Sequence, residues 1–204
     1  PVARALLDAF GGALAAPSAN RFGQISPTRA EHVTCEFGDE VAAVIDGGPC
    51  AVGVESTIVD LSGPQPRLLR PGMIGADALA KVLGQAPASV AAAEGPRAPG
   101  RLASHYAPRA PMQRLAGTLL VDRLRQCLAA GERVVVLARQ SAPDDLREER
   151  WIEMPQDAAA CARALYAQLR RADTLAPDRI LIEEPPASED WDAIRDRIRR
   201  ASHS

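Results

Sequence analysis

The sequence has 204 residues, of which 47% are hydrophobic, 25% charged and 3% aromatic, which is enough apolar material for one large or two small domains. Its net charge of −2 excludes the strong positive field that holds polyanionic nucleic acid, so we expect no stable nucleic-acid complex. No run approaches the roughly 20 apolar residues of a membrane span, and the first residues lack the order of a signal peptide, which favours a cytoplasmic protein.

The first part of the chain begins with two predicted helices. Apolar residues at helical spacing predict a helix over Val2–Phe10, which Gly11-Gly12 ends. A second helix is expected to begin in the region of Ser26 and Thr28. Ser26 precedes a proline, as N-cap residues often do, whereas Thr28 and Glu31 have the spacing of a competing capping box.

Strand-like runs of apolar and β-branched residues follow, each ended by a turn. They are Val41–Ile45, Val52–Leu61 and Arg67–Arg70. Neighbouring strands joined by tight turns favour an antiparallel part of a sheet. A short helix is predicted after them, over Ala76–Leu83.

The composition changes after Gln85. Residues 86–111 are rich in alanine, proline and glycine, and we expect an interdomain linker there, because its prolines prevent regular structure. Strands then alternate with helices, which predicts a small three-layer α/β domain with a largely parallel sheet over residues 112–204. Its predicted elements are Leu119–Ala130, Arg133–Ala138, Trp151–Met154, a long helix capped by Asp157, Arg179–Ile182 and Trp191–Ala201.

The densest cluster of small polar residues lies between Ala16 and Thr28. Backbone amides in such a turn, followed by the N-terminus of a helix, form a site for an anion such as a phosphate. A capped surface loop without a ligand would have the same composition. The residues alone leave both interpretations open.

Three further features have a binding interpretation and a plainer one. In Gly53–Asp60 polar residues interrupt an apolar strand, so either Ser56 or Thr57 faces a ligand, or the strand has one solvated face. Arg70 ends a strand, where its guanidinium offers a bidentate fork to a phosphate, or it is an ordinary surface arginine. Tyr106 is either a lid that folds over a site or an anchor packed on a domain surface.

Other catalytic arrangements find no support in the sequence. It has no nucleophile elbow, no P-loop and no dinucleotide fingerprint, so we assign no catalytic residue. The histidines lack the spacing of metal ligands and the cysteines are far apart, which indicates no metal site and reduced thiols that serve in packing. The histidines are His32, His105 and His203, and the cysteines are Cys35, Cys50, Cys127 and Cys161.

Four blocks of residues occur in a specific order along the chain. They are Pro17-Ser18-Ala19-Asn20 followed by Gly23 and Ser26-Pro27-Thr28, then Asp46-Gly47-Gly48-Pro49-Cys50, then Gly53-Val54-Glu55-Ser56-Thr57-Ile58-Val59-Asp60, and finally Leu68-Leu69-Arg70-Pro71-Gly72. With the linker motif His105-Tyr106-Ala107-Pro108, they resemble the YrdC-like L-threonylcarbamoyladenylate synthase family in its long, two-domain form. The likeness is weaker after Pro111.

The resemblance implies a fold in two parts. Residues 1–85 would form the C-terminal part of a YrdC-like mixed-sheet α/β domain, and residues 112–204 a small three-layer, Rossmann-like accessory domain. The family has an earlier section with a lysine and arginine motif, which this sequence, opening at Pro1, does not supply. We therefore expect the chain by itself to be inactive. Ser188 to Asp192 also replace a glycine-containing turn of the family.

The resemblance also implies an activity, the synthesis of threonylcarbamoyl-AMP and pyrophosphate from L-threonine, bicarbonate and ATP. The product would pass to a separate tRNA-modifying transferase, and Mg²⁺ would accompany ATP. Carried over residue by residue, contacts with threonine fall on Ser56 or Ser18. Contacts with ATP or its adenylate product fall on Ser18, Asn20, Thr28, Arg70 and Tyr106.

Two other functions use a YrdC-like fold. One is a carbamoyltransferase-type domain of hydrogenase maturation, which would also need an acylphosphatase-like segment and cysteine-rich zinc motifs. The other is a non-enzymatic module that binds nucleotide or double-stranded RNA, against which the near-neutral charge weighs.

Overall fold

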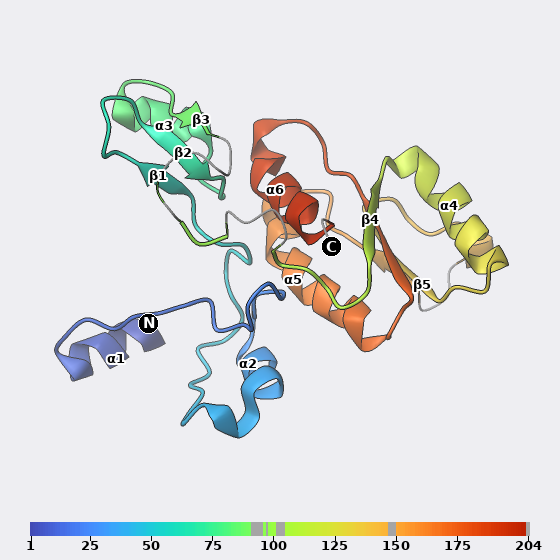
Figure 1. Cartoon of the computed structure of the whole chain (residues 1–204), viewed down its shortest axis with the longest axis horizontal. Helices are drawn as coiled ribbons and strands as arrows, with labels where there is room; N and C mark the ends of the chain where they lie inside the picture. The colour runs from blue at the N-terminus through green and yellow to red at the C-terminus, as the bar shows by residue number, and fades with distance from the viewer. Residues whose placement is uncertain (91–95, 97, 101–104, 147–149, 203–204) are drawn as a thin grey trace.

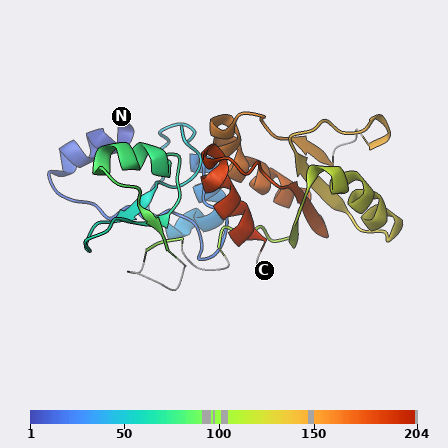
Figure 2. The same ribbon diagram turned by 90° about the horizontal axis from the view of Figure 1, so that it is seen from above.

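The computed structural model describes residues 1–90, 96, 98–100, 105–146 and 150–202. Two sheets organise the chain, a three-stranded sheet in the order β1-β2-β3 and a four-stranded sheet in the order β4-β7-β5-β6. The first is mixed and the second is parallel throughout. The predicted fold class, a mixed-sheet α/β part followed by a three-layer α/β domain, is confirmed. Figures 1 and 2 show helix α6 between the three-stranded sheet and helix α4.

The N-terminal part has three helices, α1 (Val2–Phe10), α2 (Ala30–Phe37) and α3 (Ala76–Leu83), and none of them has a buried residue. The predicted bounds of α1 and α3 are confirmed, and Gly11 ends α1 with a φ of 69°. The predicted side-chain cap of α2 is wrong. The helix begins after Arg29 without a side-chain cap, because the Ser26 hydroxyl donates a hydrogen bond to Glu55 instead.

The three-stranded sheet consists of β1 (Ile58–Asp60), β2 (Arg67–Arg70) and β3 (Ala88–Ser89). β1 and β2 are antiparallel, as predicted, whereas β3 lies parallel to β2 inside the predicted linker. The strand predicted over Val41–Ile45 is wrong, since no described strand pairs with this segment. The strand predicted over Val52–Leu61 is reduced to β1, because Gly53 has a φ of 89° and the register shifts at Ile58.

The C-terminal part alternates strands and helices, and every element predicted there is present within two residues. A further edge strand, β4, was not predicted. The elements are β4 (Met112–Leu115), α4 (Gly117–Ala129), β5 (Val134–Ala138), β6 (Trp151–Glu153), α5 (Ala158–Thr174), β7 (Arg179–Glu183) and α6 (Asp192–Ala201), with short 3-10 turns at Gly38–Glu40, Asp144–Leu146 and Glu189–Trp191. Asp157 caps α5 as predicted by accepting a hydrogen bond from the Ala160 amide at 2.8 Å.

The parallel sheet is the middle of three layers. On β5, Val134 and Val136 pack in the same cluster as Leu120 and Leu124 of α4. The alternate residues Val135 and Leu137 pack with residues of α5 and α6 on the other face. This second cluster also contains Ile25, Val54 and Tyr106, so the core on the α5 and α6 side extends into the N-terminal part.

The cysteines divide between the two parts. Cys127 and Cys161 are buried, as expected of packing residues, whereas Cys35 and Cys50 are exposed, so the prediction was wrong for this pair. Burial raises the pKa of the Cys161 thiol to about 11, which keeps it protonated at neutral pH. Among the described helices, none is long and apolar enough to cross a membrane.

Candidate functional site

Tyr106 lies at the contact between the two parts of the chain. Its side chain is 2% exposed, and its backbone has a φ of 63°, a value that L-residues other than asparagine and aspartate rarely adopt. The ring stacks on Tyr166 of α5, with centroids 5.5 Å apart and planes at 26°. The guanidinium of Arg197 in α6 lies 5.3 Å from the centroid of the Tyr106 ring. Tyr106 is therefore anchored on the C-terminal part.

The surroundings of Tyr106 keep its hydroxyl protonated. Burial raises the pKa of this hydroxyl, and the negative charge of Glu55 raises it further. The guanidiniums of Arg197 and Arg70 act in the opposite direction, without reversing the shift. The hydroxyl is thus a hydrogen-bond donor at neutral pH.

Arg70, at the end of β2, lies beside Tyr106. It is 7% exposed, and it donates from Nε to the Ser56 carbonyl at 3.1 Å and from Nη1 to the Pro99 carbonyl at 3.0 Å. Both side chains approach Gly100 closely, since a Cβ there would overlap the Tyr106 hydroxyl and lie 3.2 Å from Arg70 Nη1. The structure thus brings together Ser56, Arg70 and Tyr106.

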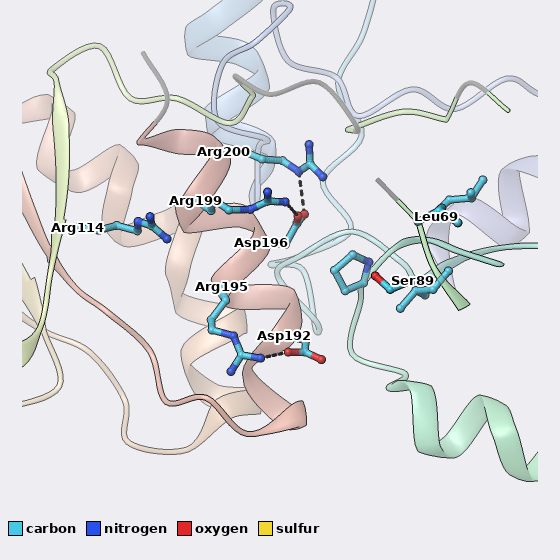
Figure 3. A pocket seen from close by; sticks show the side chains of 11 residues that line it. Leu69, Ser89, Arg114, Asp192, Arg195, Asp196, Arg199 and Arg200 are labelled. Carbon is cyan, nitrogen blue, oxygen red and sulfur yellow. Dashed lines mark hydrogen bonds and ion pairs between the residues drawn. The ribbon is translucent and has the colours of Figure 1, made fainter. Parts of the chain in front are cut away.

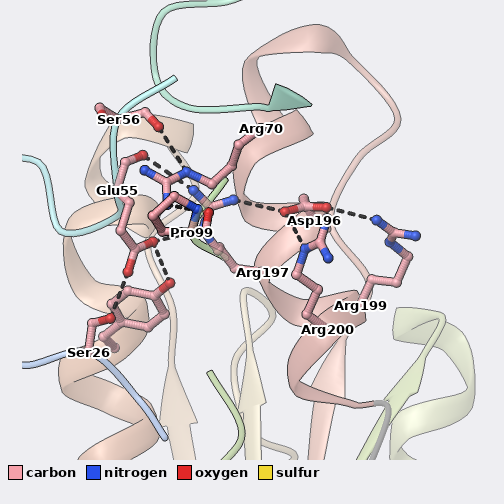
Figure 4. A network of polar contacts seen from close by, with 10 residues as sticks. Ser26, Glu55, Ser56, Arg70, Pro99, Asp196, Arg197, Arg199 and Arg200 are labelled. Atoms are coloured by element: carbon pink, nitrogen blue, oxygen red, sulfur yellow. Dashed lines mark hydrogen bonds and ion pairs between the residues drawn. The ribbon is translucent and has the colours of Figure 1, made fainter. Parts of the chain in front are cut away.

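Glu55, which was not among the residues predicted for the site, connects three segments of the chain (Figure 4). Its carboxylate accepts hydrogen bonds from Ser26 Oγ at 2.7 Å, from the Tyr166 hydroxyl at 2.8 Å and from Arg197 Nε at 2.8 Å. Burial by itself raises the pKa of Glu55, but the charge of Arg197 and these hydrogen bonds outweigh it and hold the pKa below its usual value. Glu55 is therefore ionised.

Arg197 is the cation that balances this carboxylate. Its side chain has no exposed surface, and a second carboxylate, Asp196, accepts from its Nη1 at 2.9 Å. Burial disfavours the charged form, but Tyr166 and Glu55 raise the pKa of Arg197 above its usual value. The sequence carries one signal for this residue, because Arg197 lies on the apolar face of α6 between Ile194 and Ile198.

The polar loop between Ala16 and Thr28 runs beside the Tyr106 segment, since the Ala107 amide donates to the Gly23 carbonyl at 2.9 Å. Asn20 shapes this loop by donating from Nδ2 to the Gln24 carbonyl at 2.9 Å. Its Oδ1 atom is buried and has no hydrogen-bond partner among the described residues. Ala19, next to it, has a φ of 53°, and such strained backbone is frequent at functional sites.

The other predicted residues of this loop lie differently. Ser18 is exposed, and the structure does not place it against Arg70 or Tyr106. Thr28 is 4% exposed, and its Oγ1 atom lies 3.4 Å from His32 Nδ1. Burial and the charge of Arg170 lower the pKa of His32, so the ring is neutral at pH 7.

Two cavities of about 550 Å³ each lie between the two parts of the chain, a size typical of ligand pockets. Figure 3 shows the first, with Leu69 and Ser89 on one side and α6 on the other. Its arginines pair with neighbouring carboxylates, as Arg199 and Arg200 do with Asp196. None of the six predicted site residues lines either cavity.

The described part of the chain contains no group of three or more histidine, cysteine, aspartate and glutamate side chains that could hold a metal ion. His203 lies outside the described residues, as do residues 91–95, 97 and 101–104 of the predicted linker. The site is therefore built from arginines, tyrosines, hydroxyls and backbone groups around one ionised glutamate.

Comparison with known proteins assigns this arrangement to a family. Residues 74–203 match the family described as "Threonylcarbamoyl-AMP synthase, C-terminal domain", and residues 1–72 match the family described as "Telomere recombination". The threonylcarbamoyl-AMP synthase of Bacillus subtilis (strain 168) is 32% identical over 216 residues, which cover 99% of this chain and 60% of the relative. The synthase of Pyrococcus abyssi (strain GE5 / Orsay) is 32% identical and covers 98% of this chain. The chain belongs to the threonylcarbamoyl-AMP synthase family.

Solved structures agree with this membership. The crystal structure of P. abyssi Sua5 complexed with L-threonine superposes with a TM-score of 0.83 at 31% identity, over 97% of this chain and 60% of that chain. A variant of the same protein superposes with a TM-score of 0.85 at 30% identity. The chain spans about 60% of the length of the curated relatives it matches.

Proposed function

We propose that this chain is part of an enzyme that makes threonylcarbamoyl-AMP and pyrophosphate from L-threonine, bicarbonate and ATP. The observation that carries the proposal is the convergence of Ser56, Arg70 and Tyr106 in a chain of the synthase family. The reported relatives carry the name of this synthase, which favours it over a hydrogenase-maturation domain or an RNA-binding module.

Each predicted residue has a place in this proposal. Arg70 and Tyr106 supply a guanidinium and a protonated hydroxyl for the phosphate groups of ATP or the adenylate. Asn20, whose buried Oδ1 lacks a described partner, and Thr28 would contact the same nucleotide. Ser56 would contact threonine. Ser18 would contact threonine or the nucleotide from the exposed part of its loop.

The chemistry requires positioning and neutralisation of charge more than a covalent nucleophile. A carbamate oxygen of N-carboxythreonine, formed from threonine and bicarbonate with loss of water, attacks the α-phosphorus, and pyrophosphate leaves. The guanidinium of Arg70 and the hydroxyl of Tyr106 stabilise the negative charge that develops on the phosphate oxygens. No catalytic acid or base is assigned to the chain.

The described residues do not fit a protein-held Mg²⁺ site. Magnesium in nucleotide sites is bound by one or two carboxylates together with substrate phosphates. Two carboxylates of this polar network, Glu55 and Asp196, both accept hydrogen bonds from buried arginines. We propose that Mg²⁺ accompanies ATP and is bound by its phosphates.

The domain limits are part of the proposal. We divide the chain into residues 1–85, which belong to the catalytic domain, a linker over residues 86–111 and an accessory domain over residues 112–204. The product would pass to a tRNA-modifying transferase in the cytoplasm.

The proposal is tested with the parent protein at the length of its relatives. We expect pyrophosphate release from ATP that requires both L-threonine and bicarbonate. Omission of each substrate in turn is the control. Release that is indifferent to threonine would contradict the synthase and leave a threonine-independent ATP hydrolase or binding module.

Arg70 provides a sharper test in the same protein. Arg70→Ala should weaken ATP binding by about 1 to 3 kcal/mol, the usual worth of a charge-assisted hydrogen bond, measured by calorimetric titration. Arg67→Ala is the matched control, because Arg67 lies on the same strand and pairs with Asp60 instead. An unchanged affinity in Arg70→Ala would remove this residue from the nucleotide site.

A further inference from the structure

Tyr106 has an unfavourable backbone conformation and a buried side chain, and neighbouring residues of the linker alone do not account for either. Its φ of 63° is unfavourable for a tyrosine, and such a conformation persists only where the surroundings determine it. Its neighbour His105 contacts the ring at a centroid distance of 4.2 Å. Arg70 of β2 lies beside its hydroxyl, whereas the contacts with its ring that are distant in sequence come from α5 and α6 of the C-terminal part.

Two side chains of the C-terminal part hold the Tyr106 ring. Tyr166 of α5 stacks on it nearly in parallel, at 5.5 Å and 26°. Arg197 of α6 lies 5.3 Å from the ring centroid, within the range of a cation–π contact. Both are almost fully buried, with Tyr166 at 1% exposed, and both donate hydrogen bonds to Glu55, so we assign neither a direct contact with a substrate.

Glu55 fixes these two side chains relative to the N-terminal part. Its Oε2 atom accepts hydrogen bonds from both the Tyr166 hydroxyl and Arg197 Nε at 2.8 Å, so the orientation of each is defined by the same atom. The neighbouring Ser56 carbonyl holds Arg70. Glu55 and Ser56, two consecutive residues of the N-terminal part, thus connect the buried pair with the guanidinium of Arg70, and Figure 4 shows Glu55, Ser56, Arg70 and Arg197 together.

We infer that Tyr166 and Arg197 are positioning residues for the synthase reaction, and that the C-terminal part contributes to catalysis by holding Tyr106 beside Arg70. This inference rests on the proposed function, and it gives the accessory domain a defined role. The buried arginine and the buried tyrosine of the C-terminal part both contact the ring of Tyr106, which is the residue that we place beside the nucleotide.

The test is a double-mutant cycle in the parent protein, with kcat/KM for ATP as the measurement. Tyr166→Leu removes the stacked ring and should lower kcat/KM roughly 2- to 10-fold, the range of an aromatic pair. In a Tyr106→Ala background the same substitution should have no further effect, because the ring that it positions is gone. Effects that multiply in the double variant would overturn the inference.

Tyr166→Phe and Leu169→Ala separate positioning from general loosening of α5. The phenylalanine retains the stacked ring and loses only the hydrogen bond to Glu55, whose carboxylate Ser26 and Arg197 still satisfy, so it should recover most of the activity that Tyr166→Leu loses. Leu169 is 1% exposed on the same helix, and Leu169→Ala should reduce stability with kcat/KM unchanged in the folded protein. Equal losses of kcat/KM in Tyr166→Leu and Leu169→Ala would overturn the inference.

Hydrogen exchange gives a measurement that does not depend on activity. The Ala107 amide is bonded to the Gly23 carbonyl, and its exchange should accelerate in Tyr166→Leu and remain near the wild-type rate in Tyr166→Phe and Leu169→Ala. If the wild-type protein lacks threonine-dependent pyrophosphate release, the proposed function fails, whichever way exchange behaves. Release with unchanged Ala107 exchange in Tyr166→Leu would overturn the inference alone.

Discussion

The two parts of the chain differ in how far each one buries its own side chains. Helices α1, α2 and α3 of the N-terminal part have no buried residue, whereas α5 of the C-terminal part has seven. Leu6 is 46% and Phe10 59% exposed on α1. The C-terminal part thus has an extensive core of its own, and Ile25 and Val54 of the N-terminal part are buried in the same cluster as residues of α5 and α6.

The buried polar contacts of the proposed site lie at the boundary between the two parts. The buried polar residues of the N-terminal part include Ser26 and Arg70, and both lie near the boundary with the C-terminal part. Glu55, between them, is bonded to Tyr166 and Arg197 across that boundary. The well-packed C-terminal part therefore supports the proposed site, to which the less buried N-terminal part contributes Ser56 and Arg70.

The largest expected effect concerns the buried cation at this boundary. Arg197→Gln leaves Glu55 without its charge partner and should lower the free energy of unfolding by about 3 to 5 kcal/mol, measured by urea denaturation. The matched control is Arg133→Gln, which breaks an exposed pair with Asp178 at 2.9 Å and should cost no more than about 1 kcal/mol. Equal losses would mean that the boundary pair has no special weight.

Apolar truncations test the difference in burial directly. Leu165 in α5 is fully buried, and Leu165→Ala should cost about 2 to 5 kcal/mol through lost contacts and a cavity. Leu6→Ala on α1 should change stability by less than about 0.5 kcal/mol, as at most surface positions. A large loss of stability from Leu6→Ala in the parent protein would show that other residues of that protein cover α1. The difference in burial between the two parts would then hold only for the described residues.

Substitutions of two glycines with similar φ values distinguish backbone strain from steric overlap with Tyr106. Gly131, with a φ of 78°, has open space around it, whereas a Cβ at Gly100, with a φ of 74°, would overlap the Tyr106 hydroxyl. Gly131→Ala should cost about 1 to 2 kcal/mol for the left-handed conformation alone. Gly100→Ala should cost more and weaken ATP binding, as followed by denaturation and titration. Similar results at both positions would contradict the close approach of Tyr106.

The smallest expected effect is a dependence on pH. The pKa of Glu55 in the folded protein lies below its ordinary value of 4.5, so its contribution to stability is present above pH 4.5 and is lost as the pH falls through the lowered pKa. Glu55→Gln should therefore flatten the acid side of a stability profile measured by denaturation at a series of pH values. Glu153→Gln, at an exposed position of β6, should leave the profile unchanged.

Sequence patterns predicted the C-terminal part well because the signals for its elements, apolar periodicity and capping residues, lie within each element. Periodic apolar residues and the Asp157 cap define α5, and apolar runs define β5 and β7. The strand expected at Val41–Ile45 failed because a strand requires a partner, and periodicity carries no information on pairing. Strand β4 was missed at a sheet edge, where only Met112 of Met112–Leu115 is buried.

The site was predictable only in part, for a similar reason. Arg70 and Tyr106 stand beside turn residues and carry recognisable motifs, so they could be singled out before the fold was known. Glu55 lies in the same motif as Ser56, but its partners Tyr166 and Arg197 are remote in sequence. A buried arginine on the apolar face of α6 was a readable sign that some carboxylate must face it, though not which one.

The sequence distance between these partners has a consequence for the synthesis of the protein. Arg197 and Glu55 are 142 residues apart, and closing so long a loop is a late and slow event in folding. A growing chain that leaves the ribosome N-terminus first would already display the polar loop and Arg70. It could complete the boundary only after α6 had emerged, so the contacts of Glu55 with Tyr166 and Arg197 would form late in synthesis.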